Sequence, residues 1–397
     1  MTPAPIYLNA MGVSCALGCG ASEVRASLFD AAQPAGVMVT DRWTPGRPLW
    51  LGALRHEPPP LGDDTPAPLR SRNNALLLQT LAQLRGAVDA AIGRHGPGRV
   101  AVVLGTSTAG VSEGEAAARR RAAGGGWPRG YDYAQQEMAS PAAFIARELG
   151  VHGPSHGVST ACSSAAKALA SGARLLRAGI VDAVVAGGAD TLCGLTIAGF
   201  GALESVSAAR TNPLSANRRG INIGEGAALF LMTREPGPVR LAGWGETSDA
   251  HHMSAPEPGG RGAIDAMREA LQRAGIAASA VDYVNLHGTA TVQNDAMEAR
   301  AVAEVLGLDV PVSATKPLTG HALAAAAALE TAIAWLTLVD NPRGDLPPHW
   351  WDGAADPALA PLRIAAPGTS LGRAPRHVLS NSFAFGGSNA VLVLAGE

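Results

Sequence analysis

Cys162 is the residue in this sequence best placed to act as a nucleophile. It follows Ser159, Thr160 and Ala161 at the end of a short extended run, and an Ala-rich helical stretch begins directly after it. A thiol at the head of a helix lies near unpaired backbone N–H groups and the positive end of the helix dipole, which favour the thiolate. Most free cysteines are small buried apolar residues, so position alone leaves a structural role open.

Two histidines in the C-terminal part of the chain could handle protons. His287 precedes a Gly- and Thr-rich segment at residues 288–291, and His321 opens a second Ala-rich stretch. An unperturbed imidazole titrates near neutral pH, which suits a general acid or base. A single histidine in such a place is commonly structural. A catalytic role therefore requires that the fold bring both rings to Cys162.

The remaining cysteines do not predict a metal site. Cys15 and Cys19 are spaced like a pair of metal ligands, but no second pair of Cys or His accompanies them, and Cys193 stands alone. Structural metal sites draw on four such ligands, and a disulfide framework needs more cysteines. We therefore expect neither a metal nor disulfides.

Lys167 and Lys316 are the only lysines among the 31 basic residues. The compact ammonium of lysine makes contacts that the planar guanidinium of arginine cannot imitate. A lysine retained in an arginine-rich sequence is therefore a candidate for a specific contact, although chance is an equal alternative for Lys167.

The elements that must position these residues predict an α/β fold with an internal duplication. Short β-branched runs alternate with long Ala/Leu-rich stretches throughout. Similar segments recur in the same order: residues 102–108 (VVLGTST) match 284–291 (VNLHGTAT), and residues 157–162 (GVSTAC) match 311–316 (PVSATK). Such a repeat predicts two equivalent units. Their equivalent turns would converge at the centre and bring the cysteine and the two histidines together.

A cluster of helix and strand breakers at residues 235–238 marks the junction of the two halves. We predict an N-terminal half at residues 1–236, which carries the cysteine nucleophile and an inserted cap at about residues 109–144. The C-terminal half, residues 237–397, carries both histidines.

Composition excludes several classes of function. The chain has 31 Lys and Arg against 33 Asp and Glu, so it lacks the basic excess of a nucleic-acid-binding protein. Charged residues make up only 16% and hydrophobic residues 47%, which indicates extensive interior or interface and favours an oligomer. No apolar run is long enough to span a bilayer, and the first residues lack the features of a secretion signal. We therefore expect a cytoplasmic protein without a membrane span.

Four motifs together resemble the elongating β-ketoacyl-acyl-carrier-protein synthases. They are TACSSA at residues 160–165, HGTAT at 287–291, ATKPLTGHALAAAAALE at 314–330 and NSFAFGGSNA at 381–390. The motifs follow the family's order over almost the whole chain. The resemblance implies a thiolase-like fold, in which duplicated halves stack as five αβαβα layers, and a dimeric protein.

The same resemblance implies roles for individual residues. Cys162 would be the acylated nucleophile, with His287 and His321 completing a Cys-His-His set. Lys316 and Glu330 would form an orienting ion pair, and Phe385 would gate the site and supply an oxyanion N–H. Substrate contacts would come from Thr289, Thr291, Phe383 and Asn381.

The implied activity is that of an acyltransferase that condenses malonyl units with an enzyme-bound acyl chain by a decarboxylative Claisen reaction. The substrates would arrive on the phosphopantetheine of an acyl carrier protein, so we expect no further cofactor. Arg119, Arg120 and Arg121 could meet an acidic carrier or simply form a solvated helix face.

The pathway would be fatty-acid-like or, by closer resemblance, aryl polyene or polyketide biosynthesis. The dimer could be homomeric or could contain a chain-length-factor-like homologue. Two alternatives compete with this function. A non-catalytic chain-length partner is disfavoured because Cys162 is present, and a thiolase-type acyltransferase is disfavoured because no cysteine follows Cys193.

Overall fold

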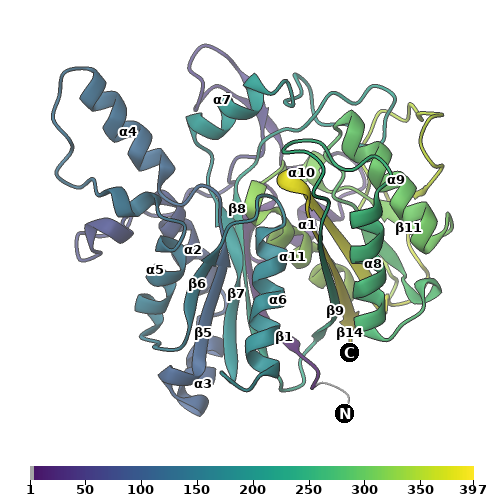
Figure 1. The fold of residues 1–397 in the computed structure, drawn as a ribbon, viewed down its shortest axis with the longest axis horizontal. Helices are drawn as coiled ribbons and strands as arrows, with labels where there is room; N and C mark the ends of the chain where they lie inside the picture. The colour runs from purple at the N-terminus through teal and green to yellow at the C-terminus, as the bar shows by residue number, and fades with distance from the viewer. Residues whose placement is uncertain (1–3) are drawn as a thin grey trace.

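Each half of the chain builds a five-stranded sheet with the same strand order. The computed structural model describes residues 4–397, shown in Figure 1. The N-terminal order is β6 (Ser155–Val158), β5 (Val100–Gly105), β7 (Ala183–Asp190), β8 (Gly226–Thr233) and β1 (Tyr7–Cys15). The C-terminal order is β11 (Pro311–Ser313), β10 (Tyr283–Asn285), β13 (His377–Ala384), β14 (Ser388–Gly396) and β9 (Val239–Ser248). In both halves the third strand of the unit lies at one edge and the first at the other, which confirms the predicted duplication.

The two half-sheets join where β1 pairs with β9. This antiparallel contact is short, pairing Tyr7 with Arg240 and Leu8 with Val239. Two further short strands lie at the side of the sheet: β2 (Gly18–Cys19) pairs with β1, and β12 (Arg363–Ile364) pairs with β11. A separate hairpin consists of β3 (Met38–Thr40) and β4 (Leu49–Leu51).

Helices cover both faces of the two half-sheets. The middle layer holds α6 (Ser164–Arg177) and α11 (Ala326–Leu338), which contact each other and share one apolar core with both sheets. Every residue of α11 is buried. The outer layers are α2 (Arg72–Ala82), α3 (Arg85–His95) and α5 (Ser140–Leu149) on one side, and α8 (Arg261–Ala274) and α9 (Val292–Leu306) on the other. These are the five predicted αβαβα layers.

The predicted cap region forms the most prominent projection of the molecule. Its main element is α4 (Val111–Ala122), which extends away from the sheets in Figure 1 and is followed by η3 (Tyr133–Gln136). Helix α5 begins at Ser140, inside the predicted cap, and Phe144 packs in the N-terminal outer core. The last residues of the segment therefore belong to the layered body.

The remaining short elements lie mainly in the connections between the layers. They are α1 (Ala21–Leu28), α7 (Gly194–Ala202), α10 (Lys316–Thr319), η1 (Ala67–Leu69), η2 (Pro97–Arg99), η4 (Ala278–Ala280), η5 (Leu323–Ala325) and η6 (Phe385–Gly387). Within residues 4–397, no helix combines the length and apolarity that a bilayer crossing requires.

Candidate active site

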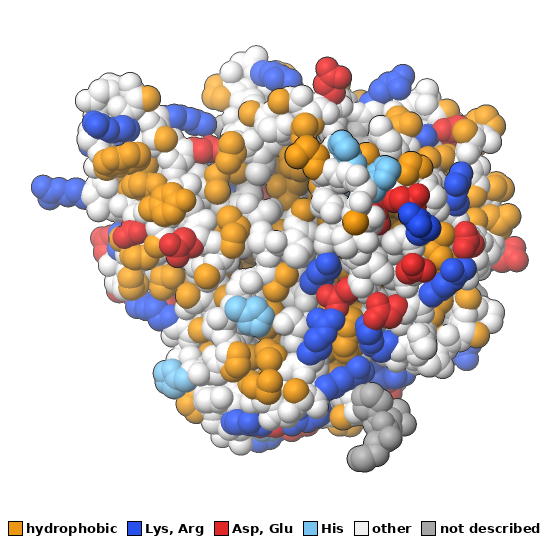
Figure 2. All heavy atoms as spheres, in the orientation of Figure 1, with side chains coloured by type: hydrophobic (Ala, Val, Ile, Leu, Met, Phe, Trp, Pro, Cys, Tyr) orange, Lys and Arg blue, Asp and Glu red, His pale blue; other side chains and the backbone are white. Residues whose placement is uncertain are grey.

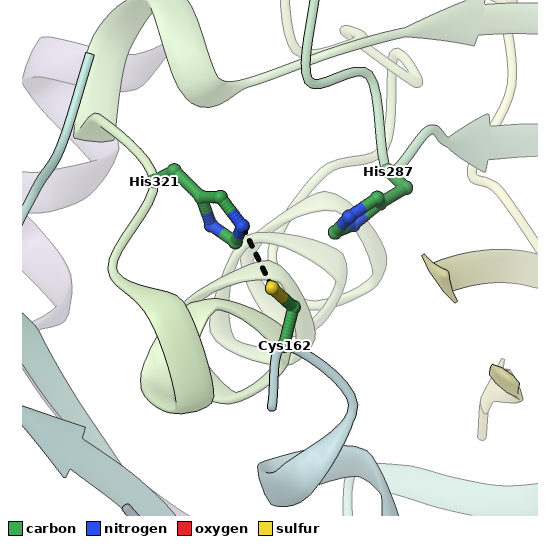
Figure 3. Close-up of side chains that lie close together, drawn as sticks. All are labelled: Cys162, His287 and His321. Atoms are coloured by element: carbon green, nitrogen blue, oxygen red, sulfur yellow. Dashed lines mark hydrogen bonds between the residues drawn. The ribbon is translucent and has the colours of Figure 1, made fainter. Parts of the chain in front are cut away.

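Cys162, His287 and His321 converge on one point at the centre of the molecule (Figure 3). The distance from Cys162 Sγ to His321 Nε2 is 3.0 Å, and one ligand atom from each of the three residues lies within 4.8 Å of the others. The two imidazole rings lie edge to face with centroids 5.4 Å apart. The fold thus brings together the nucleophile of one half and the histidines of the other, as the duplicated topology predicts.

The turns that carry these side chains include left-handed backbone at non-glycine residues. Ala161 precedes the cysteine with φ 51°, Ala290 follows His287 with φ 57°, and Leu323 follows His321 with φ 48°. This conformation is unfavourable for an L-residue and persists where surrounding structure enforces it. Strained turns around all three groups indicate that their placement is fixed by the fold.

Burial controls the protonation of all three groups. It raises the pKa of Cys162 to about 12, although the nearby Lys316 ammonium acts in the opposite direction. Burial also holds the pKa of His287 and that of His321 well below 6.5, and Lys316 adds to both effects. Desolvation therefore acts against the thiolate that the helix head is expected to favour, and it favours the neutral form of both imidazoles.

Lys316 orients His287 through two contacts and forms an ion pair with Glu330. Its Nζ lies 2.5 Å from Glu330 Oε1, also donates to the carbonyl oxygen of His287, and lies 3.3 Å from His287 Nδ1. Because an ammonium can only donate, His287 Nδ1 accepts and the ring proton resides on Nε2. The His287 Nε2–H group is thus available to donate into the site. Lys316 and Glu330 are both buried, as an orienting ion pair requires.

Two buried carboxylates hold the loops that follow equivalent strands of the two halves. Asp190 accepts hydrogen bonds from Thr106, Ser107 and Thr108 after β5, and from the backbone N–H of Ala324. Glu298 accepts from the backbone N–H groups of His287 and Gly288 after β10. Burial raises the pKa of Glu298 to about 7. Sequence analysis assigned no role to either residue. A charged residue that ends the otherwise apolar run 183–190 is the signal that could have identified Asp190.

A cavity of about 70 Å³ opens onto Cys162 and both histidines. Four predicted residues line it: Thr289, Thr291, Phe383 and Phe385. The two threonine hydroxyls lie 2.9 Å apart, and the Phe383 ring packs edge-on against His287. Asn381 is different, because it is buried outside the lining and donates to Glu298 Oε1 at 3.0 Å. Further lining residues that the sequence did not identify include Phe200, Ile221 and Ser254.

Backbone amides complete the surroundings of the sulfur. The N–H groups of Phe385 and of Cys162 itself act on Sγ, and both lower the pKa of the thiol. The same two groups can stabilise an oxyanion formed on a thioester attached to Cys162.

The Cys162, His287 and His321 atoms also have the separation of a metal-ligand set. The Lys316 ammonium at 3.3 Å from His287 Nδ1 places a positive charge directly behind this set. A cation would be repelled there, so the arrangement suits proton transfer and anion stabilisation better than metal binding.

Arg119, Arg120 and Arg121 lie in the last turn of α4. This turn is distant in sequence from Cys162, His287 and His321. Figure 2 shows basic side chains over the projecting α4 segment, beside hydrophobic ones. Helix α4 also contacts α7, because Glu115 accepts hydrogen bonds from the N–H groups of Gly194 and Leu195 at the start of α7.

Two similar halves, with a cysteine from one and two histidines from the other at the centre, have the layered arrangement of the thiolase-like fold. The chain belongs to the β-ketoacyl synthase family. Its residues 77–236 match the family model "Beta-ketoacyl synthase, N-terminal domain", and residues 239–348 match the C-terminal domain of the same family.

Individual relatives agree with this assignment. A chain of the solved complex of the ketosynthase ApeO with its chain length factor ApeC, from Xenorhabdus doucetiae, is 42% identical. The alignment covers 99% of this chain and 98% of that one, with a TM-score of 0.93. The 3-oxoacyl-[acyl-carrier-protein] synthase 2 of Rhizobium meliloti (strain 1021) is 35% identical over 62% of this chain and 61% of the relative. Nodulation protein E of Rhizobium meliloti is 33% identical over 74% and 75% of the two chains. The chain thus spans about three fifths of the length of the curated synthase.

Proposed function

We propose that this protein is an elongating β-ketoacyl-acyl-carrier-protein synthase, an acyltransferase that catalyses decarboxylative Claisen condensation. The observation that carries the proposal is the contact between Cys162 Sγ and His321 Nε2 at 3.0 Å, with His287 within reach of the same point. Two histidines beside the nucleophile favour condensation over thiolase chemistry, and the cysteine itself favours a catalytic subunit over a chain-length partner.

The first half-reaction transfers an acyl group to Cys162. The thiol attacks the thioester carbonyl of an acyl-carrier, and its proton passes through His321 Nε2 to the departing pantetheine thiolate. The N–H groups of Cys162 and Phe385 hold the oxyanion. A carbon–sulfur bond forms and another breaks, so the products are acyl-Cys162 and the free carrier thiol.

The second half-reaction consumes a malonyl-carrier. Loss of CO2 leaves an enolate whose oxygen accepts hydrogen bonds from Nε2 of His287 and of His321; for neutral His321 this requires that its ring proton move from Nδ1 to Nε2 once acylation has removed the thiol. Neutral imidazoles suit this step, and burial with Lys316 keeps the pKa of both histidines low enough for neutrality. The carbanion attacks the acyl-Cys162 carbonyl, and the product is a 3-oxoacyl chain two carbons longer on the carrier. The Cys162 thiolate released in this step takes a proton from water.

The substrates require a carrier and its phosphopantetheine, and we propose no other cofactor. Thr289 and Thr291 line the cavity where the amides of that arm would lie. The exposed arginines at the end of α4 are the proposed contact for an acidic carrier protein, because α4 packs on α7 and Phe200 of α7 lines the cavity. By resemblance, the pathway is aryl polyene or related polyketide biosynthesis, in the cytoplasm.

We also propose that the chain works as a dimer. Strand β6 forms the outer edge of the N-terminal half-sheet and pairs with β5 on one side. A solved relative is a ketosynthase in complex with its chain length factor, which supports a heterodimer with a homologous subunit. Native mass spectrometry of the chain alone, and of the chain co-expressed with such a homologue, distinguishes a homodimer from a heterodimer.

Intact-mass analysis with acyl-carrier and malonyl-carrier tests the chemistry. We expect an acyl adduct on the protein, its disappearance after malonyl-carrier is added, and a longer 3-oxoacyl chain on the carrier. Cys162→Ala should give no adduct, whereas the matched control Cys193→Ala, which removes another buried thiol, should behave as the native protein. An adduct that persists in Cys162→Ala would contradict the assigned nucleophile.

A further inference from the structure

The second lysine of the sequence, Lys167, makes a specific contact that the catalytic set does not explain. Its Nζ lies 2.6 Å from the hydroxyl oxygen of Ser388. Ser388 directly follows η6, the turn that contains Phe385 and the two glycines 386 and 387. Lys167 stands on α6, five residues after Cys162. We propose that Lys167 is a positioning residue that fixes the Phe385 turn against the turn of the nucleophile.

The hydrogen bonds around Ser388 form a chain with one direction. The ammonium of Lys167 can only donate, so Ser388 Oγ accepts from it and uses its own proton for Ser163 Oγ at 2.9 Å. Ser163 in turn donates to the carbonyl oxygen of Thr160 at 2.8 Å. This series of hydrogen bonds therefore begins at Lys167, passes through Ser388 at the end of the Phe385 turn and ends at the strained backbone just before Cys162. Hydrogen bonds aligned in this way strengthen one another.

These hydrogen bonds act on the glycine-containing part of the Phe385 turn. Gly386 and Gly387 have φ 78° and 70°, so the turn depends on residues with little intrinsic stiffness. On its far side the turn is held by two backbone bonds, from Gly386 N to Met253 O and from Asp249 N to Gly387 O. On the near side Ser388 is paired with Ala384 and Ser248 in the sheet, and the lysine contact ties it to α6. Without the lysine contact, the Phe385 N–H loses its fixed distance from the Cys162 sulfur.

Lysine suits this place better than arginine. The acceptor is a single hydroxyl between two packed segments, and Lys167 is partly buried there. A planar guanidinium presents a fork of donors for a two-oxygen partner and would leave several of them unsatisfied at one hydroxyl. The retained lysine in an arginine-rich chain is thus explained by the geometry of its partner.

The inference rests on the proposed function only in its catalytic consequence, so the test has two independent readouts. In Lys167→Met, we expect acyl transfer from acyl-carrier to Cys162 to slow about tenfold, the loss typical of a charge-assisted hydrogen bond. Alkylation of Cys162 by iodoacetamide needs no oxyanion and should slow less than acyl transfer does, because the Phe385 N–H affects it only through the pKa of the thiol. Hydrogen–deuterium exchange of the peptide that contains residues 385–388 should become faster in the same variant.

Two further variants separate positioning from loss of structure. Ser388→Ala removes the same bond from the other end, and the double variant should be no slower than the slower single one, because both changes break one chain. Arg268→Met, which removes an exposed charge from α8, should leave all readouts unchanged. If Lys167→Met loses alkylation and acyl transfer together, the substitution has damaged the fold. The positioning role is then judged from the Ser388→Ala variant alone.

The outcomes for the proposal and for the proposed function differ. Native protein that exchanges and alkylates normally but accepts no acyl group would refute the proposed function and leave the exchange test valid. Unchanged exchange and unchanged acyl transfer in Lys167→Met and Ser388→Ala would refute the positioning role.

Discussion

The buried ion pair of Lys316 and Glu330 affects both the stability of the protein and the orientation of His287. Lys316 and Glu330 form an ion pair that is almost fully shielded from solvent, with burial raising the pKa of the carboxyl to about 7. A charge without its partner is very costly in such surroundings, whereas a well-packed apolar pair costs little. The ammonium also fixes the proton of His287 on Nε2, so its catalytic value is separable from its contribution to stability.

Lys316→Met should therefore lower the free energy of unfolding by about 3–5 kcal/mol, because Glu330 remains as an unpaired buried acid. Adding Glu330→Leu should restore most of that stability. Neither variant should decarboxylate malonyl-carrier at more than about a hundredth of the native rate, because His287 loses its orienting donor. Urea unfolding and CO2 release measure the two effects. Recovery of activity together with stability would show that the lysine is merely structural.

At the scale of elements, close backbone contact sets where the nucleophile lies. Gly105 ends β5 beneath the start of α6, and a Cβ there would lie 2.6 Å from the backbone nitrogen of Ala165. No flexible side chain is available to move aside. The absence of a side chain at Gly105 thus allows the helix that follows Cys162 to approach the sheet.

Gly105→Ala should displace α6 and lower the free energy of unfolding by about 1–3 kcal/mol, with a loss of Cys162 acylation. The matched control is Gly93→Ala in α3, where an added Cβ meets nothing within 4 Å. At that exposed helix position the same substitution should stabilise by about 0.5–1 kcal/mol. Thermal unfolding shows whether each substitution raises or lowers the stability of the protein. Equal effects at the two positions would contradict the close-approach argument.

His349, in the Pro-rich connection at residues 341–361, bonds to the residue that follows β11 and to Pro213. His349 Nδ1 accepts from Ala314 N at 3.0 Å, and Nε2 donates to Pro213 O at 3.0 Å. Burial lowers the pKa of His349 to about 4. The unfolded chain therefore binds this proton near pH 6.5 while the folded one does not, so the contribution to stability is complete above pH 6.5 and falls as pH decreases towards 4.

His349→Gln should remove this dependence. We expect the free energy of unfolding of the native protein to fall by up to about 3 kcal/mol more than that of the variant between pH 7 and pH 4. Urea titrations at several pH values measure the difference. Parallel curves for the two proteins would show that folding does not lower the pKa of His349.

Features of the fold and of the site that are encoded in local sequence patterns could be predicted from the sequence. The duplication and the convergence of Cys162, His287 and His321 follow from repeated segments and motifs. The protonation state of Cys162 was not predictable, because it depends on how deeply the finished fold buries the thiol. Asp190 and Ser388 were missed for a similar reason, since their partners are far away along the chain, at residues 106–108 and 163–167. The division at residue 236 is still a prediction.

At the scale of the whole molecule, the two halves are interlocked and are not merely adjacent. Helix α11 belongs to the C-terminal half but contacts β1 and β8 of the N-terminal one, and α6 contacts β14 in return. The middle layer is therefore a core that neither half can complete alone. The active site has the same property, because its thiol and its imidazoles come from different halves.

Separating the chain at the predicted junction tests this interdependence. Residues 1–236 and 237–397, expressed alone, should each expose the apolar face that the middle layer buries, and neither should show cooperative unfolding. Co-expressed, the two fragments should assemble, because pairing of β1 with β9 and packing of α11 between the sheets need no covalent link. The assembled pair should regain acylation of Cys162, measured by intact mass. A half that unfolds cooperatively alone would show that the duplicated units are independent domains, and the site would then be an interface between them.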